Sequence, residues 1–128
     1  MPTWEIFDQR SVPIVTVPIV AIQKRGILSL NQAAFEALSS PPAVELLFDR
    51  ESRMVGLRGV DTAAPHAYTV RKQPGANTYV VSAKSFVKAY DIPTDVTRRY
   101  RADFADGVLS IDLRKAGLEI QSRRRKQT

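Results

Sequence analysis

Apolar residues recur along the chain in short runs, and polar turns or prolines stand between these runs. Short runs rich in Val, Ile, Leu and aromatic residues are typical of β-strands. Pro13 and Pro18 cannot donate to a strand ladder, so the first run is expected at a sheet edge or bent. The pattern predicts strands at 12–22, 27–30, 44–48, 54–57, 68–72, 79–81, 98–104 and 108–113.

Two short helices are predicted among these strands. Asn31 is a favourable N-cap for a helix over 32–39, which Pro41-Pro42 terminate. Ser82 is the corresponding N-cap of a helix over 83–90. Helical spacing predicts one apolar face in each helix, made of Ala34, Phe35 and Leu38 in the first and of Phe86, Val87 and Tyr90 in the second.

The order of elements repeats. Each half gives a strand, a basic turn, a short strand, a capped helix and a hairpin, and the Asp106-Gly107 pair is a strong hairpin signal. An offset of 51 aligns Asn31 with Ser82 and Phe35 with Phe86. The alternative is that any α+β chain with two short helices can be divided in this way.

The predicted fold follows from the size of each half. The repeat covers 12–60 and 68–113, with a loop at 59–67 between them, and a unit of about 50 residues has a marginal core by itself. We therefore expect one domain over 1–128, of class α+β and mostly β, in which two β-β-α-β-β units interlock. A polar, basic tail over 114–128 is expected to lack regular structure.

In the second half a basic strand end leads through a turn into an apolar strand and the helix. The residues are Val70-Arg71-Lys72-Gln73-Pro74-Gly75-Ala76-Asn77-Thr78-Tyr79-Val80-Val81. This stretch resembles the opening of the AbrB/MazE/SpoVT swapped-hairpin family, and 24–49 resembles it more weakly. Members of that family usually build a barrel from two chains. The resemblance, over 17–113, implies a single-chain pseudo-dimer with a barrel-like body, as in MraZ-like members, and a DNA-binding role in transcription regulation.

The chain departs from the family pattern in three places. The helix at 32–39 carries Glu36 and neither Arg nor Lys, where the family tends to be basic. Asn77-Thr78 stands where a glycine–basic pair is common, and the second basic turn is about one residue longer than the first. The resemblance therefore implies DNA contact more clearly for the second half than for the first.

Charge is unevenly distributed along the chain. Residues 1–64 carry six Lys/Arg and seven Asp/Glu, whereas residues 65–128 carry thirteen and six. The net charge is +6, and four of the positive charges stand at Arg123, Arg124, Arg125 and Lys126. Because clustered cations attract polyanions, nucleic acid is the first partner to consider.

The side chains needed for catalysis are scarce. The sequence has no Cys and one His, His66, which excludes thiol chemistry and histidine-based metal sites. The acidic pairs Asp103/Asp106 and Asp49/Glu51 stand in or near turns, where carboxylates serve local hydrogen bonds. We therefore expect no enzyme, no metal and no cofactor.

The binding prediction depends on pairs of cations. Lys24-Arg25 and Arg71-Lys72 occupy corresponding turns, so the two pairs are expected to meet on one basic surface, with Gln23, Asn77 or Thr78 at base edges. Lys84 and Lys88 share one helix face. On the strand at 98–104, Tyr100 stands between arginines, as a base-stacking residue or a core residue. The candidate nucleic-acid-binding residues are Lys24, Arg25, Arg71, Lys72, Lys84, Lys88, Arg98, Arg99 and Arg101.

Three functions remain open at this point. The first is a DNA-binding transcription regulator. The second is a single-stranded nucleic-acid binder of Whirly-like type, and the third is a protein-interaction module without a nucleic-acid role. The chain has neither an apolar run of about 18 residues nor a signal-peptide pattern, so a cytoplasmic protein without a membrane segment is expected, and it could form homo-oligomers.

Overall fold

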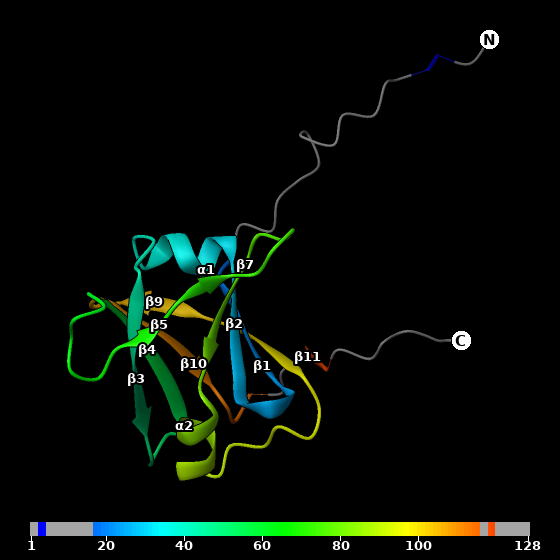
Figure 1. The fold of residues 1–128 in the computed structure, drawn as a ribbon. Helices are drawn as coiled ribbons and strands as arrows, with labels where there is room; N and C mark the ends of the chain where they lie inside the picture. Colours follow the sequence, from blue (N-terminus) through cyan, green and yellow to red (C-terminus); the bar gives the residue numbers. More distant parts are fainter. Residues whose placement is uncertain (1–2, 5–16, 116–117, 120–128) are drawn as a thin grey trace.

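A computed structural model describes residues 3–4, 17–115 and 118–119 of the chain. The described residues form two antiparallel sheets (Figure 1), with strand orders β11-β8-β1-β2-β7-β6 and β5-β3-β4-β10-β9. The strands are β1 Ile19–Gln23, β2 Ile27–Asn31, β3 Ala43–Asp49, β4 Met54–Val60, β5 Tyr68–Thr69, β6 Arg71–Lys72, β7 Thr78–Ser82, β8 Arg98–Arg101, β9 Asp103–Ala105, β10 Val108–Asp112 and β11 Leu118–Glu119; the helices are η2 Lys24–Gly26, α1 Gln32–Ala37 and α2 Lys84–Ala89.

The predicted mostly-β class is confirmed, although the pairing gives two separate sheets and no closed barrel among the described residues. Two segments predicted as single strands are each divided between the sheets. Segment 68–72 supplies β5 to one sheet and β6 to the other. The segment predicted at 98–104 supplies β8 and, extended to Ala105, β9. At the breaks, the N–H of Val70 donates to the carbonyl of Pro42 and that of Ala102 to Pro18, both at 3.0 Å. Each segment thus pairs with strands of one sheet in its first part and with strands of the other sheet in its second part.

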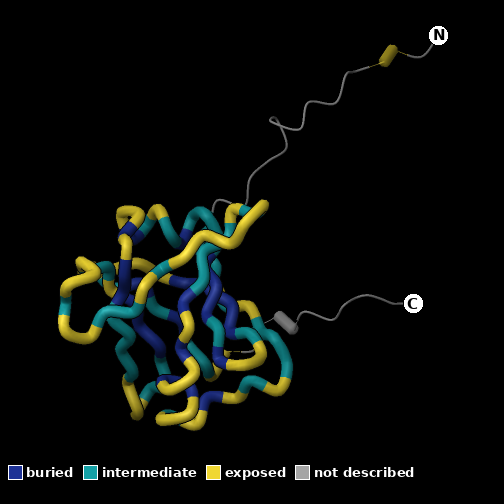
Figure 2. Tube along the Cα trace, viewed as in Figure 1, coloured by how far each residue is buried: buried dark blue, intermediate teal, exposed yellow. Residues whose placement is uncertain are grey.

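The core lies between the two sheets. Alternate residues of each strand point inward, because successive side chains of a β-strand face opposite sides. Figure 2 shows the buried residues concentrated along the central strands. The largest fully buried side chains come from both sheets and are Ile22, Leu28, Leu30, Leu57, Leu109 and Ile111.

One strand pair in each sheet joins the two halves of the sequence symmetrically. In β2·β7, Ile27 pairs with Ser82, and the register runs to Asn31 opposite Thr78. Adding 51 to each residue number of β2 gives β7, so this pairing maps onto itself with Ser29 opposite Val80 at its centre. The β4·β10 pairing is likewise symmetric under a shift of 52, about the pair Leu57 and Leu109.

The helices lie at opposite ends of the sheets (Figure 1). The predicted cap of α1 is confirmed, because the Asn31 carboxamide oxygen accepts from the Ala34 N–H at 2.9 Å. Phe35 of α1 stacks on the Tyr79 ring with centroids 3.7 Å apart. At the other end, Phe86 of α2 meets Phe48 edge to face. No helix of the described part of the chain is long and apolar enough to cross a membrane.

The second cap is placed differently from the prediction. Ser82 still belongs to β7, where it pairs with Ile27, and the N-cap of α2 is Ala83, which makes no side-chain cap bond. The burial pattern then aligns Ala34 with Phe86, so the helices correspond at a shift of 52 and not at 51. Ser82 was mistaken for a cap because its residue type favours caps, whereas the ladder to β2 extends the strand through it.

The ends of the chain also differ in part from expectation. Within the predicted tail 114–128, Leu118–Glu119 forms β11 and pairs with β8. Arg123, Arg124, Arg125 and Lys126 lie outside the described residues, as do residues 12–16 of the first predicted strand. The predicted Asp106-Gly107 turn is confirmed, since both residues have positive φ, 53° and 78°.

Gly26 brings η2 into direct contact with α2. Its carbonyl accepts from the Ala83 N–H at 2.8 Å, and its φ is +76°. A Cβ at this position would stand 2.8 Å from both the Lys84 Cα and the Val87 Cγ2. The backbone of the first basic turn can therefore approach α2 only because position 26 has no side chain.

We predict that Gly26→Ala lowers the free energy of unfolding by about 3 kcal/mol, because left-handed strain adds to overpacking. Gly75→Ala is the matched control: its φ is +75°, but nothing lies within 4 Å of a Cβ there. The control should lose only about 1 kcal/mol. Urea unfolding of both variants measures the difference, and equal losses would show that η2 does not pack closely on α2.

Candidate nucleic-acid interface

Strand register decides which predicted cations share a surface. Directly opposed residues of antiparallel strands project to the same side of a sheet. Across the six-stranded sheet, one row runs from Arg99 through Ala21, Ser29 and Val80 to Arg71. Arg101 stands opposite Ile19 in the adjacent row. Three of the nine predicted cations, Arg71, Arg99 and Arg101, therefore project from the side of this sheet that faces away from the core.

We call this side the outer sheet face and define it by Arg71, Arg99, Arg101 and the residues between them. All three arginines are exposed, and none forms an ion pair within the described part of the chain. Ala21 and Ser29 between them are small and buried. The arginines at the two ends of the row are separated by four strand spacings, or ~19 Å.

A hollow of about 320 Å³ lies on the outer sheet face. Among the residues that the structure describes, its lining combines amide and hydroxyl groups with one charged side chain, that of Arg99, and includes no carboxylate. The Asn31 carboxamide is already engaged, because it accepts from the Ile19 N–H at 3.0 Å and donates to the Val17 carbonyl. The lining residues are Ile19, Ala21, Gln23, Ser29, Asn31, Gln73, Thr78 and Arg99.

Two predicted cations project from the opposite side of the same strands. Lys72 is paired with Tyr79 and Arg98 with Ile22, which belong to the core-facing rows. Arg98 is half-buried, and its Nη1 lies 3.4 Å from the Asp95 carboxylate.

Tyr100 packs against the core, and burial raises its pKa. Of the two roles left open for Tyr100, the core role is confirmed.

The remaining four cations gather at the α2 end of the molecule. Lys24, Arg25, Lys84 and Lys88 are all exposed. η2 packs on α2 through Gly26, so the turn of the first half meets the helix of the second. Together they surround a hollow of about 270 Å³, lined by Arg25, Gly26, Lys84, Val87, Lys88, Ile92 and Thr94.

We call η2 and α2 together the first corner. Arg53 binds the C-terminal end of α2, since its guanidinium donates to the carbonyls of Tyr90 at 3.1 Å and Asp91 at 3.4 Å. The first corner adjoins the outer sheet face, because Gln23 lines one hollow and Arg25 the other.

The two basic turns do not meet, contrary to the prediction. The turn with Lys24 and Arg25 precedes Ile27, at the end of β2·β7 where Ile27 pairs with Ser82. The turn after Lys72 precedes Thr78, at the opposite end. Antiparallel pairing of the corresponding strands causes this separation. Arg71 and Lys72 are neighbours in β6, so they project to opposite sides of the sheet. Lys24 and Arg25 lie beside α2 and not beside Arg71 and Lys72.

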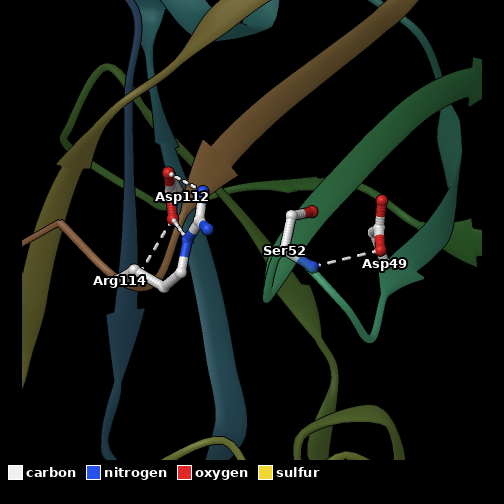
Figure 3. Close-up of polar contacts among 4 residues, drawn as sticks. All are labelled: Asp49, Ser52, Asp112 and Arg114. Atoms are coloured by element: carbon white, nitrogen blue, oxygen red, sulfur yellow. Dashed lines mark hydrogen bonds and ion pairs between the residues drawn. The ribbon is translucent and has the colours of Figure 1, made fainter.

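Carboxylates gather on the outer side of the five-stranded sheet. Asp49 and Asp112 both pair with Met54 across β3, β4 and β10, and Glu45 pairs with Arg58. Figure 3 shows Arg114 bound to the Asp112 carboxylate, with Nη2 to Oδ2 at 3.0 Å, and the Ser52 N–H directed at Asp49. The two sheets therefore present different outer sides: one carries three arginines, and on the other the carboxylates of Glu45 and Asp112 are paired with arginines.

The histidine and the acidic residues considered for catalysis or metal binding lie in loops, in turns or at strand ends. His66 is exposed in the loop between β4 and β5, and Asp106 lies in the β9–β10 turn. Asp49 accepts the N–H groups of Glu51 and Ser52. Among the described residues, no group of three or more His, Cys, Asp or Glu is arranged to hold a metal ion.

Sequence reasoning missed Ser29, Gln73 and Thr94, which line the two hollows. Ser29 stands inside an apolar strand, and its alternation with Leu28 and Leu30 was the available signal for its outward direction. Gln73 and Thr94 carry no comparable signal, because loop geometry places them.

Comparisons of the chain with models of protein families, with curated proteins and with solved structures gave no match.

We predict that Asp112→Asn makes the stability of the folded chain depend less on pH below pH 5. Hydrogen bonding by Arg114 lowers the pKa of Asp112 below its ordinary value of 3.8, and the backbone N–H of Ser52 does the same for Asp49. A lowered pKa stabilises the folded state fully above the ordinary value, and this contribution is lost as the pH falls through the lower one. Thermal unfolding between pH 5 and pH 2, at low salt, should show a shallower decline for the variant; parallel curves would contradict the assignment.

Proposed function

We propose that this chain binds double-stranded nucleic acid, most naturally DNA, through the outer sheet face and the adjoining first corner, as a binding protein and not an enzyme. The observation that carries the proposal is the sorting of charge. Seven of the nine predicted cations stand on these two adjoining surfaces, and no carboxylate from the described ranges lines either hollow. Such an arrangement concentrates phosphate-bearing polymers at one part of the molecule.

Duplex is favoured over single strands by the direction of the aromatic side chains. Single-strand binders stack bases on exposed aromatic rings. Here Tyr100 packs on the core and Tyr79 stacks on Phe35, so neither ring is offered on the outer sheet face. Arginines ~19 Å apart at the ends of one row suit phosphates on two strands better than one flexible chain.

Within this proposal, cations and polar groups have separate tasks. The arginines and lysines contact backbone phosphates, which provides affinity and orientation without reading sequence. Gln23 and Thr78, which line the hollow, would meet base edges, as Gln does with adenine. The Asn31 carboxamide is excluded from this task, because it caps α1 and continues the β1 ladder.

The swapped-hairpin fold and a role in transcription regulation are part of the same proposal. Two features support a tandem pseudo-dimer. The pairings β2·β7 and β4·β10 each map onto themselves when the two halves are exchanged. In addition, segments 68–72 and 98–105 each give strands to both sheets, which links the sheets at both sides as a barrel-like body would require.

We predict that Arg99→Gln with Arg101→Gln weakens binding to a random-sequence 16-bp duplex about tenfold or more at low salt. The slope of log K against log salt should fall by about 1.8, because two phosphate contacts are lost. Fluorescence anisotropy between 50 and 200 mM salt measures both quantities.

The matched control is Arg58→Gln with Arg114→Gln. It removes the same charge from the five-stranded sheet, where both arginines form exposed ion pairs, and it should leave affinity and slope nearly unchanged. Tighter binding of the wild type to an unstructured single strand would instead favour the Whirly-like function. Absence of binding to either at low salt would leave the protein-interaction module.

A further inference from the structure

The corresponding corners of the two halves differ in charge. The first corner combines η2 with α2. At the other end of β2·β7, the turn 73–77 and α1 occupy the corresponding places (Figure 1), and we call them the second corner. Each corner thus takes its turn from one half of the sequence and its helix from the other.

Helix by helix, the cations of α2 have no counterpart in α1. Lys84 and Lys88 are the first and fifth residues of α2, on one face. The first and fifth residues of α1 are Gln32 and Glu36. These two bind each other, since the Gln32 Nε2 donates to the Glu36 carboxylate at 2.7 Å. Two exposed cations of α2 therefore correspond in α1 to an amide and a carboxylate that are hydrogen-bonded to each other.

The turns of the two corners also differ in charge, and again the first corner is the more positive. Lys24 and Arg25 stand in η2, whereas residues 73–77, Gln-Pro-Gly-Ala-Asn, carry no charge. The first corner has four cations and no acid, while the second has one acid and no cation. Arg71 and Lys72 lie on β6, before the second turn, and Lys72 belongs to a core-facing row.

We infer that, of the two corners, only the first joins the outer sheet face in binding a duplex, so that one chain contacts a single, non-palindromic stretch of backbone despite the symmetry of its strand pairing. This inference rests on the proposed function. Repulsion between Glu36 and phosphate opposes contact at the second corner, whereas the first corner releases counterions for up to four cations. A symmetric target would then require two chains, one for each half-site.

The test compares equal charge changes at the two ends. Lys84→Gln with Lys88→Gln removes two charges from the first corner. Pro74→Glu with Ala76→Glu lowers the net charge equally at the second corner, in its uncharged turn, and leaves the hydrogen bond between Gln32 and Glu36 in place. Binding of each variant to a 16-bp random-sequence duplex is measured by anisotropy from 50 to 200 mM salt, and circular dichroism verifies that both are folded.

The first variant should bind at least tenfold more weakly, with a salt slope reduced by about 1.8, and the second should stay within twofold of the wild type. Equal weakening, or no change in the first variant, would overturn the one-sided contact while leaving duplex binding established. If the wild type itself binds no duplex at 50 mM salt, the proposed function fails.

A gain-of-charge variant keeps the inference testable if the first variant fails to fold. Gln32→Lys with Glu36→Lys gives the second corner the helix charges of the first. Native mass spectrometry with a 10-bp duplex should then detect a second bound duplex per chain, where the wild type binds one. Two duplexes on the wild type would contradict the inference.

Discussion

The antiparallel pairing of β2 with β7 is the constraint on which the rest of the structure depends. It joins the halves of the chain through buried residues such as Leu28 and Val81, and its register sends Ser29 and Val80 outward. A slip by one residue would turn every apolar side chain of a strand away from the core, so burial fixes the register strongly. The same register brings Arg71 and Arg99 into one row, although neither arginine contributes to the core.

Charge is sorted by the fold and not by the order of residues along the chain. Arg25 and Lys88 are far apart in sequence and line one hollow, whereas the neighbours Arg98 and Arg99 project to opposite sides of one strand. Gly26 makes the corner possible, because only a residue without a side chain permits this approach of η2 to α2. Shape and electrostatics at the proposed interface therefore depend on one backbone contact.

Local patterns predicted most of the elements, and long-range pairing explains the failures. The apolar runs located the main strands, and Asn31 and Asp106-Gly107 were recognised because cap and turn chemistry is local. Ser82 was misassigned because its ladder to Ile27 depends on a distant strand. The breaks at Val70 and Ala102 were missed for the same reason, since a strand that changes sheets looks continuous in sequence. At the site, residue type found the cations, but only the register could show that Lys72 and Arg98 face the other way.

The central claim is that duplex nucleic acid is bound by one side of a charge-sorted molecule. The most direct measurement is an amide chemical-shift titration of the isotope-labelled chain with a short duplex, which reports contacts residue by residue without any substitution. The account predicts that shifts concentrate in β1, β2, β6, β7, β8, η2 and α2, while those of β3, β4 and β10 stay small. Shifts centred on the five-stranded sheet, or spread evenly over both sheets, would contradict it.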